Sequence, residues 1–367
     1  MILKNESQKK IKPSFKPREF SHDRRLPKIV FALFLGAVSG YICNLASLPL
    51  PWMLGAMFVN IIAALIGLPI AGPTKLRPVV AVVIGVMLGS SFTPTIFDQI
   101  SLWAPSLIFM ALYLLIAALV IIPYYRWVGG FDTSTAYFAG MPGGLMEMMI
   151  IGKEMGADER SIILAHTSRI VLVVALVAVW FRVVQGIDLS DRSQFGIPFS
   201  QIPASELIIL TVVGVTGYFA GRILRLPAPM LLGPILVSAA VHLSGIVHNP
   251  PPRELVIIAQ IFLGTIVGCR FINTEPKAIL RAIWLGLGAT TLMLTLTIGF
   301  AVVLHEIFEQ SLEQLVLAYS PGGLAEMSLV ALAMNADIAY VASHHLVRIS
   351  FVMLLAPTLF RLFLRPK

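Results

Sequence analysis

Six ionisable residues lie in long apolar stretches of the chain, where a charged side chain is costly unless another group compensates it. They form two sets of the same composition: Glu147, His166 and Arg169, followed by Glu326, His345 and Arg348. In each set the histidine and the arginine are three residues apart, so both lie on one face of a helix. This combination predicts a proton or anion site, in which arginine binds the anion and Glu or His exchanges the proton.

A Pro-Gly-Gly sequence precedes each glutamate within an apolar segment. The residues are Pro142, Gly143 and Gly144 in the first set, and Pro321, Gly322 and Gly323 in the second. Proline removes a backbone donor and glycine weakens a helix, so each segment is predicted to be a broken helix. Paired broken helices are typical of secondary transporters, where free amides favour an anion and free carbonyls favour a cation. All twelve residues are therefore predicted to form one substrate or ion site.

Three other interpretations of these residues stay open. The glutamates and arginines can form structural bridges between helices, and the Pro-Gly-Gly sequences can be kinks that allow close packing. Two histidines and two glutamates are also candidate ligands for an oxygenase metal, although the neighbouring arginines disfavour a bound cation. We therefore predict no metal, no cofactor and no catalytic residue, and no nucleotide-binding loop is present in the sequence.

Other repeated residues have structural interpretations. Asp158 and Asp337 each precede a predicted helix and are expected to cap it. His344 is adjacent to His345 but on a different helix face, and we expect it to have no part in the site. Glycines four residues apart predict close contact between helices. These pairs are Gly85 with Gly89 and Gly264 with Gly268.

The composition requires a membrane environment for the elements that position these residues. Of the 367 residues, 57% are hydrophobic and only 13% are charged, and the mean hydropathy is +0.87. Soluble globular proteins carry about 25% charged residues, so a soluble enzyme is excluded. The two cysteines, Cys43 and Cys269, are too few for a disulfide framework or a cysteine-rich zinc site.

The chain contains an internal duplication. The segment from Pro142 to Arg169 returns 179 residues later as the segment from Pro321 to Arg348, with the same Pro-Gly-Gly-Leu, Glu-Met, Ala-Asp, His and Arg positions. Leu-Pro-x-Pro sequences beginning at Leu48 and Leu226 form a second repeated block. The duplication predicts four regions. They are a basic tail at 1–28, a first membrane repeat at 29–185, a linker at 186–204 and a second membrane repeat at 205–363.

An all-α membrane protein with about ten transmembrane helices and two re-entrant or broken segments follows from the apolar windows. If the broken segments do not cross, the second repeat is inverted and nearly all Lys and Arg residues lie on the inner side, together with both termini. If both cross, twelve helices result and more basic residues face outward. The positive-inside rule favours the inverted arrangement. The predicted helices are at about 29–47, 51–70, 78–92, 102–125, 161–184, 207–225, 229–247, 254–269, 283–304 and 340–361, and the broken segments at about 133–152 and 314–333.

The repeated Pro-Gly-Gly-Leu-x-Glu-Met motif, the His-x-x-Arg pairs and the Leu-Pro-x-Pro block resemble the AbrB family of bacterial membrane proteins. The resemblance covers nearly the whole chain after residue 28. It implies a multi-pass protein of the bacterial inner membrane, of a family labelled both ammonia monooxygenase-like and a regulator of gene expression. This family is distinct from the soluble DNA-binding regulators that share its name.

These observations predict a secondary transporter that moves a small anionic metabolite with proton coupling. The alternatives are a membrane-bound regulator of gene expression without transport and, third, a metal-dependent monooxygenase. The expected partners are the lipid bilayer and an anionic small molecule, with a homo-oligomer left open. No nucleic-acid partner is expected, because the basic tail has neither interleaved aromatic residues nor a DNA-binding motif. Its basic residues instead suit a cytoplasmic anchor at anionic lipid headgroups.

Overall fold

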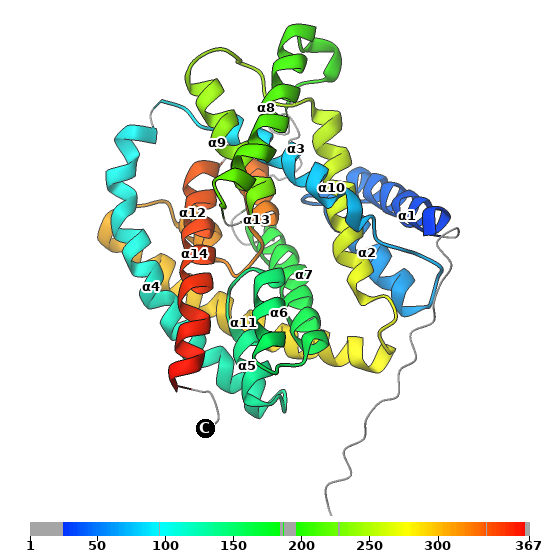
Figure 1. The fold of residues 1–367 in the computed structure, drawn as a ribbon, viewed down its shortest axis with the longest axis vertical. Coiled ribbons are helices and arrows are strands. Elements are labelled where there is room, and N and C mark those ends of the chain that lie inside the picture. Colours follow the sequence, from blue (N-terminus) through cyan, green and yellow to red (C-terminus); the bar gives the residue numbers. More distant parts are fainter. Residues whose placement is uncertain are drawn as a thin grey trace, which may run out of the picture.

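The computed structural model describes residues 25–94, 96–183, 186, 196–226, 228–334 and 336–363, without the side chains of 96–102 and 363. Most of the predicted basic tail, much of the predicted linker and the last four residues lie outside this part of the chain. Within it, fourteen α-helices form the fold and no strand is present, which confirms the all-α class (Figure 1).

Each half of the chain has seven helices in the same order. In the first half they are α1 (Arg25–Leu45), α2 (Pro51–Leu65), α3 (Arg77–Ser90), α4 (Ile96–Trp127), α5 (Thr133–Gly140), α6 (Leu145–Glu154) and α7 (Glu159–Val183). In the second half they are α8 (Ala204–Ile223), α9 (Pro229–Leu243), α10 (Arg253–Gly268), α11 (Pro276–Phe308), α12 (Leu312–Tyr319), α13 (Leu324–Ala333) and α14 (Ile338–Phe363). A 3-10 turn, η5 (Cys269–Phe271), directly follows α10.

Ten unbroken helices occur where spans were predicted, but they differ in length. Seven of those described are long and apolar enough to cross a bilayer: α1, α4, α7, α8, α10 with η5, α11 and α14. The other three, α2, α3 and α9, have only 15, 14 and 15 residues. At 1.5 Å per residue they reach about 21–23 Å, which is shorter than the roughly 30 Å hydrocarbon core. Seven of the ten helices predicted as spans are therefore of spanning length, and the other three are shorter than predicted.

The two halves also share unusual backbone details. Leu50 and Ala228 occupy the same position of the two Leu-Pro-x-Pro sequences, directly before the first residue of α2 and α9. Both have left-handed backbone conformations, with φ of 44° and 47°, although neither is a glycine. The loop between α2 and α3 and the matching loop between α9 and α10 lie toward different ends of the molecule in Figure 1. Both observations support the predicted duplication.

The helices separate into two bundles, and each bundle takes corresponding helices from both halves. The six-helix bundle contains α1, α2 and α3 with α8, α9 and α10, and the eight-helix bundle contains α4 to α7 with α11 to α14. Packing is extensive within each bundle. Among the described residues, the larger contacts between bundles are confined to η5 against α7 and to α3 against α13 and α14. The molecule is therefore two bundles joined by a limited interface.

Glycine pairs bring the two halves together in the six-helix bundle. A side chain at Gly85 or Gly89 of α3 would overlap the backbone of α9, and one at Gly264 or Gly268 of α10 would overlap the backbone of α2. The predicted role of these glycines in close helix packing is confirmed. Each of these helices packs against a helix of the other half: α3 of the first half contacts α9 of the second, and α10 of the second half contacts α2 of the first.

Candidate functional site

Both Pro-Gly-Gly segments interrupt a helix inside the eight-helix bundle. The chain is non-helical between α5 and α6, at 141–144, and between α12 and α13, at 320–323. Pro142 and Pro321 are buried. The sequence thus correctly predicts two broken helices, each made of a short half-helix that enters the bundle and a second that leaves it.

In the first half, His166 and Arg169 of α7 hold the end of α5. Nε2 of His166 lies 2.9 Å from the carbonyl oxygen of Phe138. Because a carbonyl only accepts, Nε2 carries the proton and Nδ1 accepts a hydrogen bond from Nη2 of Arg169, at 3.0 Å. Nη1 of Arg169 donates to the carbonyl oxygen of Met141, at 3.3 Å.

The second half repeats this arrangement with the same spacings. Nε2 of His345 lies 3.0 Å from the carbonyl oxygen of Leu317, and its Nδ1 accepts from Nη2 of Arg348, at 3.0 Å. Arg348 also donates to the carbonyl oxygens of Ser320 and Gly322, at 2.5 and 2.6 Å. The histidine and its carbonyl partner are 28 residues apart in both halves. We call His166 with Arg169, and His345 with Arg348, the two His–Arg pairs.

Each arginine therefore stabilises the carbonyl end of a half-helix. The last carbonyls of a helix lack intrahelical partners and carry partial negative charge, which a cation offsets. Their Nη atoms donate to backbone carbonyls and to histidine, so only Nε of each arginine is left for an anion, and the predicted anion binding stays a prediction. In both pairs the arginine Nε is buried and has no hydrogen-bond partner.

The sequence predicts that Glu or His exchanges the proton, and the hydrogen bonds of His166 and His345 bear on which of them can do so. Both ring nitrogens of each are engaged, Nε2 as a donor to a carbonyl and Nδ1 as an acceptor from arginine. A second proton would place an N–H against a guanidinium, so the ring is held neutral. Nor do three or more His, Cys, Asp or Glu side chains of the described part of the chain converge as a metal site requires.

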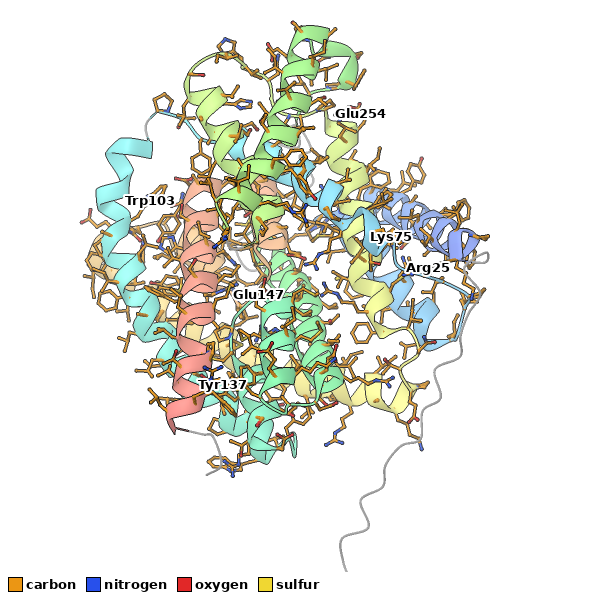
Figure 2. The ribbon with its side chains drawn as sticks, viewed as in Figure 1. Arg25, Lys75, Trp103, Tyr137, Glu147 and Glu254 are labelled. Atoms are coloured by element: carbon orange, nitrogen blue, oxygen red, sulfur yellow. The ribbon has the colours of Figure 1, made fainter. Side chains whose placement is uncertain are left out.

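Glu147 and Glu326 do not form the predicted bridges with arginine. The one ion pair among the described residues joins Lys153 to Glu159. Each glutamate instead lies in the first turn of the second half-helix and is partly exposed, with its carboxylate close to Gly144 or Gly323. Figure 2 marks the place of Glu147 in the fold. Negative charge at this position stabilises the amino end of a helix. The amino end of each second half-helix thus has a carboxylate of the same helix beside it.

The eight-helix bundle brings the two His–Arg pairs together. Arg169 and Arg348 lie within electrostatic range of one another, and both act on Tyr113 of α4. The hydroxyl of Tyr113 is 3.0 Å from that of Thr297 on α11. Side chains from both halves of the chain therefore lie in one region of the eight-helix bundle, and a single shared site stays a prediction.

The guanidinium groups leave an excess of buried positive charge. Arg169 is 3% exposed and Arg348 is 2% exposed, and no carboxylate of the described residues pairs with either. Removing an ion from water costs several kcal/mol, of the order that only a counter-ion or well-aligned dipoles offset. Carbonyl dipoles offset part of this cost here. A bound anion would offset more of it, and each Nε is an unused donor.

Arg270 is a buried cation near these residues that the sequence analysis did not single out. It lies on η5 at the contact between the bundles, and its Nη1 is buried without a hydrogen-bond partner. It is in electrostatic range of Glu326 and His166. The available signal was a cation two residues after Gly268, whose counterpart in the first half is Ser91. Arg270 has no arginine counterpart in the first half, so the duplication does not mark it.

Two further predictions about single residues have different outcomes. Asp158 and Asp337 accept hydrogen bonds from the backbone amides of Ser161 and Tyr340, at 2.9 and 3.0 Å, so their capping role is confirmed. His344, which is expected to have no part in the site, does have packing and hydrogen-bond partners of its own. It is fully buried, and its Nε2 lies 2.7 Å from the hydroxyl of Ser106.

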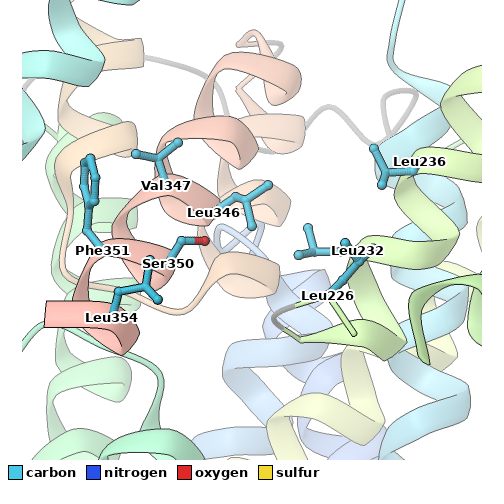
Figure 3. A pocket seen from close by; sticks show the side chains of 8 residues that line it. All are labelled: Leu226, Leu232, Leu236, Leu346, Val347, Ser350, Phe351 and Leu354. Carbon is cyan, nitrogen blue, oxygen red and sulfur yellow. The ribbon is translucent and has the colours of Figure 1, made fainter. Parts of the chain in front are cut away.

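An apolar groove of about 480 Å³ separates the bundles between α9 and α14 (Figure 3). Ser350 is the one polar residue among those that line it, and the groove does not reach the His–Arg pairs. A second apolar groove, of about 580 Å³, lies between α4 and α11. The first groove shows that the side chains of the two bundles do not fill their interface at this place.

Comparison with known proteins agrees with the resemblance found in the sequence. The AbrB family, described as "Transition state regulatory protein AbrB", matches residues 52–364. The chain is 26% identical over 365 residues to "Uncharacterized protein YhjN" of Bacillus subtilis (strain 168), covering 93% of this chain and 94% of that protein. It is 24% identical over 317 residues to "Putative regulator AbrB" of Escherichia coli (strain K12), covering 86% and 90%. The chain is therefore a membrane protein of the AbrB family.

Proposed function

We propose that this protein is a secondary transporter of a small anion. The observation that carries the proposal is the pair of buried guanidinium groups, Arg169 and Arg348, which have no carboxylate partner among the described residues and lie beside two broken helices. Paired broken helices at a repeat interface are the usual binding sites of secondary transporters. The substrate anion would accept hydrogen bonds from the free Nε donors and balance the buried charge.

The two bundles supply the parts that alternating access needs. The eight-helix bundle carries both broken helices and both His–Arg pairs, and the six-helix bundle contacts it over a limited area. Secondary transporters expose a fixed site to each side of the membrane in turn by rocking one bundle against another. The eight-helix bundle would move as the carrier, while the glycine-packed six-helix bundle stays rigid. Arg270, on the opposing bundle, would attract the anion toward the site.

The proposed location is the inner membrane of a bacterium, with both termini in the cytoplasm. The support is the distribution of Lys and Arg residues under the inverted arrangement. Thiol labelling of single cysteines introduced at positions 192 and 277 tests it, because the inverted arrangement predicts the first on the outer side and the second on the inner side. Labelling of both from one side would contradict the arrangement.

Uptake into proteoliposomes tests the transport proposal. The purified chain is reconstituted and supplied with radiolabelled acetate, lactate, succinate, citrate, phosphate and sulfate. We expect saturable uptake of at least one anion. Arg348→Ala should abolish it, and Arg348→Lys should lower it about 10- to 100-fold, because lysine keeps the charge but loses the forked donor geometry. Arg361→Ala, an exposed arginine of the same helix, is the matched control and should leave uptake unchanged.

Size-exclusion profiles of every variant establish that it is folded before uptake is compared. Absence of uptake for all six anions in the native protein would overturn the proposal. So would equal uptake by the native protein and a folded Arg348→Ala variant.

The second candidate is a membrane-bound regulator, which the names of the family and of the Escherichia coli relative favour. The tail at 1–28 and short inner loops are the surfaces that such a protein would offer to a cytoplasmic partner. Deletion of residues 1–20 separates the two functions, because a transporter keeps its flux and a regulator loses its effect on gene expression.

A further inference from the structure

A second buried polar cluster lies beside one His–Arg pair. It joins α4, α12 and α14 and consists of Ser106, Gln310, Tyr319, Tyr340 and His344, here named the His344 cluster. The hydroxyl of Tyr340 is 2.8 Å from Oε1 of Gln310 and 3.0 Å from the hydroxyl of Ser106. The Ser106 hydroxyl is 2.7 Å from Nε2 of His344, and Tyr319 donates to the Ser106 carbonyl. These groups form one continuous hydrogen-bonded chain.

The His344 cluster is present in only one half of the duplicated chain. The corresponding positions of the other half hold residues that cannot form it, although the same helices fold there. For Ser106, Gln310, Tyr319, Tyr340 and His344 in order, these counterparts are Leu285, Phe131, Gly140, Ser161 and Ala165. Burying this many polar groups is costly. The other half folds the same helices without them, so the fold itself does not require them. A requirement of function therefore explains the cluster better than a requirement of the fold.

His344 differs from the other two buried histidines in what surrounds its ring. Its Nδ1 donates to the carbonyl oxygen of Tyr340, at 2.8 Å, and its Nε2 faces a hydroxyl instead of a guanidinium. When the ring is neutral, the Ser106 hydroxyl donates to Nε2. When the ring is protonated, Nε2 donates to the Ser106 oxygen, and the hydroxyl proton turns to the carbonyl oxygen of Trp103, at 2.9 Å. Both protonation states are thus fully hydrogen-bonded.

The cluster also connects the surface with the guanidinium pair. Gln310 lies in the loop between α11 and α12 and is partly exposed, and its amide oxygen accepts the Tyr340 hydroxyl, so the hydrogen-bonded chain that starts at His344 ends close to the surface. Toward the interior of the bundle, the Tyr319 carbonyl accepts a hydrogen bond from the hydroxyl of Thr297, at 3.4 Å, and the Thr297 hydroxyl also contacts that of Tyr113. Arg348 is four residues after His344 on α14, one helical turn further along.

Other charged and titratable groups belong to the helices packed against α14. On α14 itself are Asp337, which caps it, Tyr340, His345 and Arg348, and Tyr319 of α12 touches the His344 ring. Further groups are carried at the ends of the neighbouring helices: Arg126 of α4, Glu147 and Lys153 of α6, Glu313 of α12, Glu326 of α13 and Arg77 of α3.

We propose that His344 is the proton-binding group of the transporter, that it exchanges its proton with the surface through the hydroxyls of Ser106 and Tyr340, and that its protonated form favours anion binding. The reason for the coupling is that a positive charge on His344 adds to that of Arg348 one turn away, and a bound anion is attracted by both. Proton and anion then move in the same direction. This inference rests on the proposed transport function for its coupling, but proton binding by His344 can be measured without transport.

Proton binding is tested by ¹⁵N NMR of the full chain labelled at histidine and reconstituted in lipid. Between about pH 8 and about pH 4, where histidines titrate, we expect one buried histidine to change reversibly from the Nδ1–H form to the doubly protonated form. That signal should be absent in His344→Gln. Signals of His166 and His345 should remain in the neutral Nε2–H form. His248→Gln, which removes an exposed histidine, is the matched control and should leave the His344 signal unchanged. A His344 signal that does not titrate overturns the inference.

Coupling is tested in proteoliposomes with the six-anion panel and an imposed pH gradient, acidic outside. The native protein should take up its anion at least 10-fold faster with the gradient than without it. His344→Gln should lose this acceleration while it still exchanges internal for external anion at equal pH. Retained acceleration in His344→Gln overturns the inference and leaves the proposed function standing. Absence of any anion flux in the native protein overturns the proposed function, and the coupling with it, whatever the NMR shows.

Discussion

Arg169 and Arg348 each serve two purposes at once. Each guanidinium satisfies the carbonyl end of a broken helix and adds to a buried positive charge that no described carboxylate balances. Under the proposed function, one side chain therefore combines a structural role with a binding role. For this reason an alanine at either position tests both, and Arg348→Lys separates them, because lysine keeps the charge with fewer donors.

Gly144 and Gly323, each three residues before a glutamate, are predicted to set the position of its carboxylate. A Cβ atom at Gly144 or Gly323 would overlap an oxygen of Glu147 or Glu326, which is the flexible end of a side chain. Gly144→Ala and Gly323→Ala should therefore fold, with a loss of about 0.3–1 kcal/mol from the displaced charge at the helix start. Anion uptake should change in both variants, as measured in proteoliposomes. Uptake identical to that of the native protein would show that carboxylate position is unimportant.

At this scale the sequence predicts which residues matter better than it predicts their contacts. Repetition identified the His–Arg pairs and both glutamates, because two copies of a costly residue are unlike a random pattern. It did not predict that Arg169 binds the carbonyl of Met141, since helical spacing says nothing about a backbone group 28 residues away. It missed Arg270 and His344, because neither has a repeated counterpart.

Helix ends and helix crossings determine the geometry of this fold more than helix interiors do. The breaks at Pro142 and Pro321, the caps at Asp158 and Asp337 and the glycine crossings were all predicted from the sequence, because each depends on local backbone chemistry. The shortness of α2, α3 and α9 was only partly predicted. Apolar composition continues beyond their ends into the loops, and composition alone does not mark where a helix stops.

The glycine crossings are predicted to dominate the stability of the six-helix bundle. A methyl group at Gly264 would overlap the backbone of α2, which cannot move without separating the helices. Gly264→Ala should therefore destabilise the protein by about 1–3 kcal/mol, seen as a lower thermal unfolding temperature in detergent. Gly299→Ala of α11 is the control, because its added methyl meets open space. It should leave stability unchanged or raise it by up to about 1 kcal/mol.

At the scale of the whole molecule, the two bundles each combine both halves of the duplicated chain. The sequence predicted the duplication but not this exchange, because helix pairing between distant segments depends on tertiary packing and leaves no periodic signal. Because the interface between the bundles is limited, one bundle can move against the other without disrupting the packing inside either. The apolar groove between α9 and α14 lies on this interface.

Joining the bundles covalently is predicted to stop transport. Cysteines at Leu236 and Val347, which line the groove from α9 and α14, are introduced into a chain with Cys43 and Cys269 replaced by alanine. A bifunctional thiol reagent should then lower anion uptake at least 10-fold. The control pair, Leu112 and Leu296, lines the groove between α4 and α11 within the eight-helix bundle, and its cross-link should spare uptake. Equal inhibition by both cross-links would contradict movement between the bundles.

Equilibrium binding of the transported anion to the purified protein tests the central claim most directly. If Arg169 and Arg348 share one anion, the native chain should bind one anion per molecule, and the folded double variant Arg169→Lys/Arg348→Lys should bind it at least 100-fold more weakly. Two independent and equal sites per chain, or unchanged affinity in the double variant, would contradict the claim that the paired guanidinium groups form a single anion site.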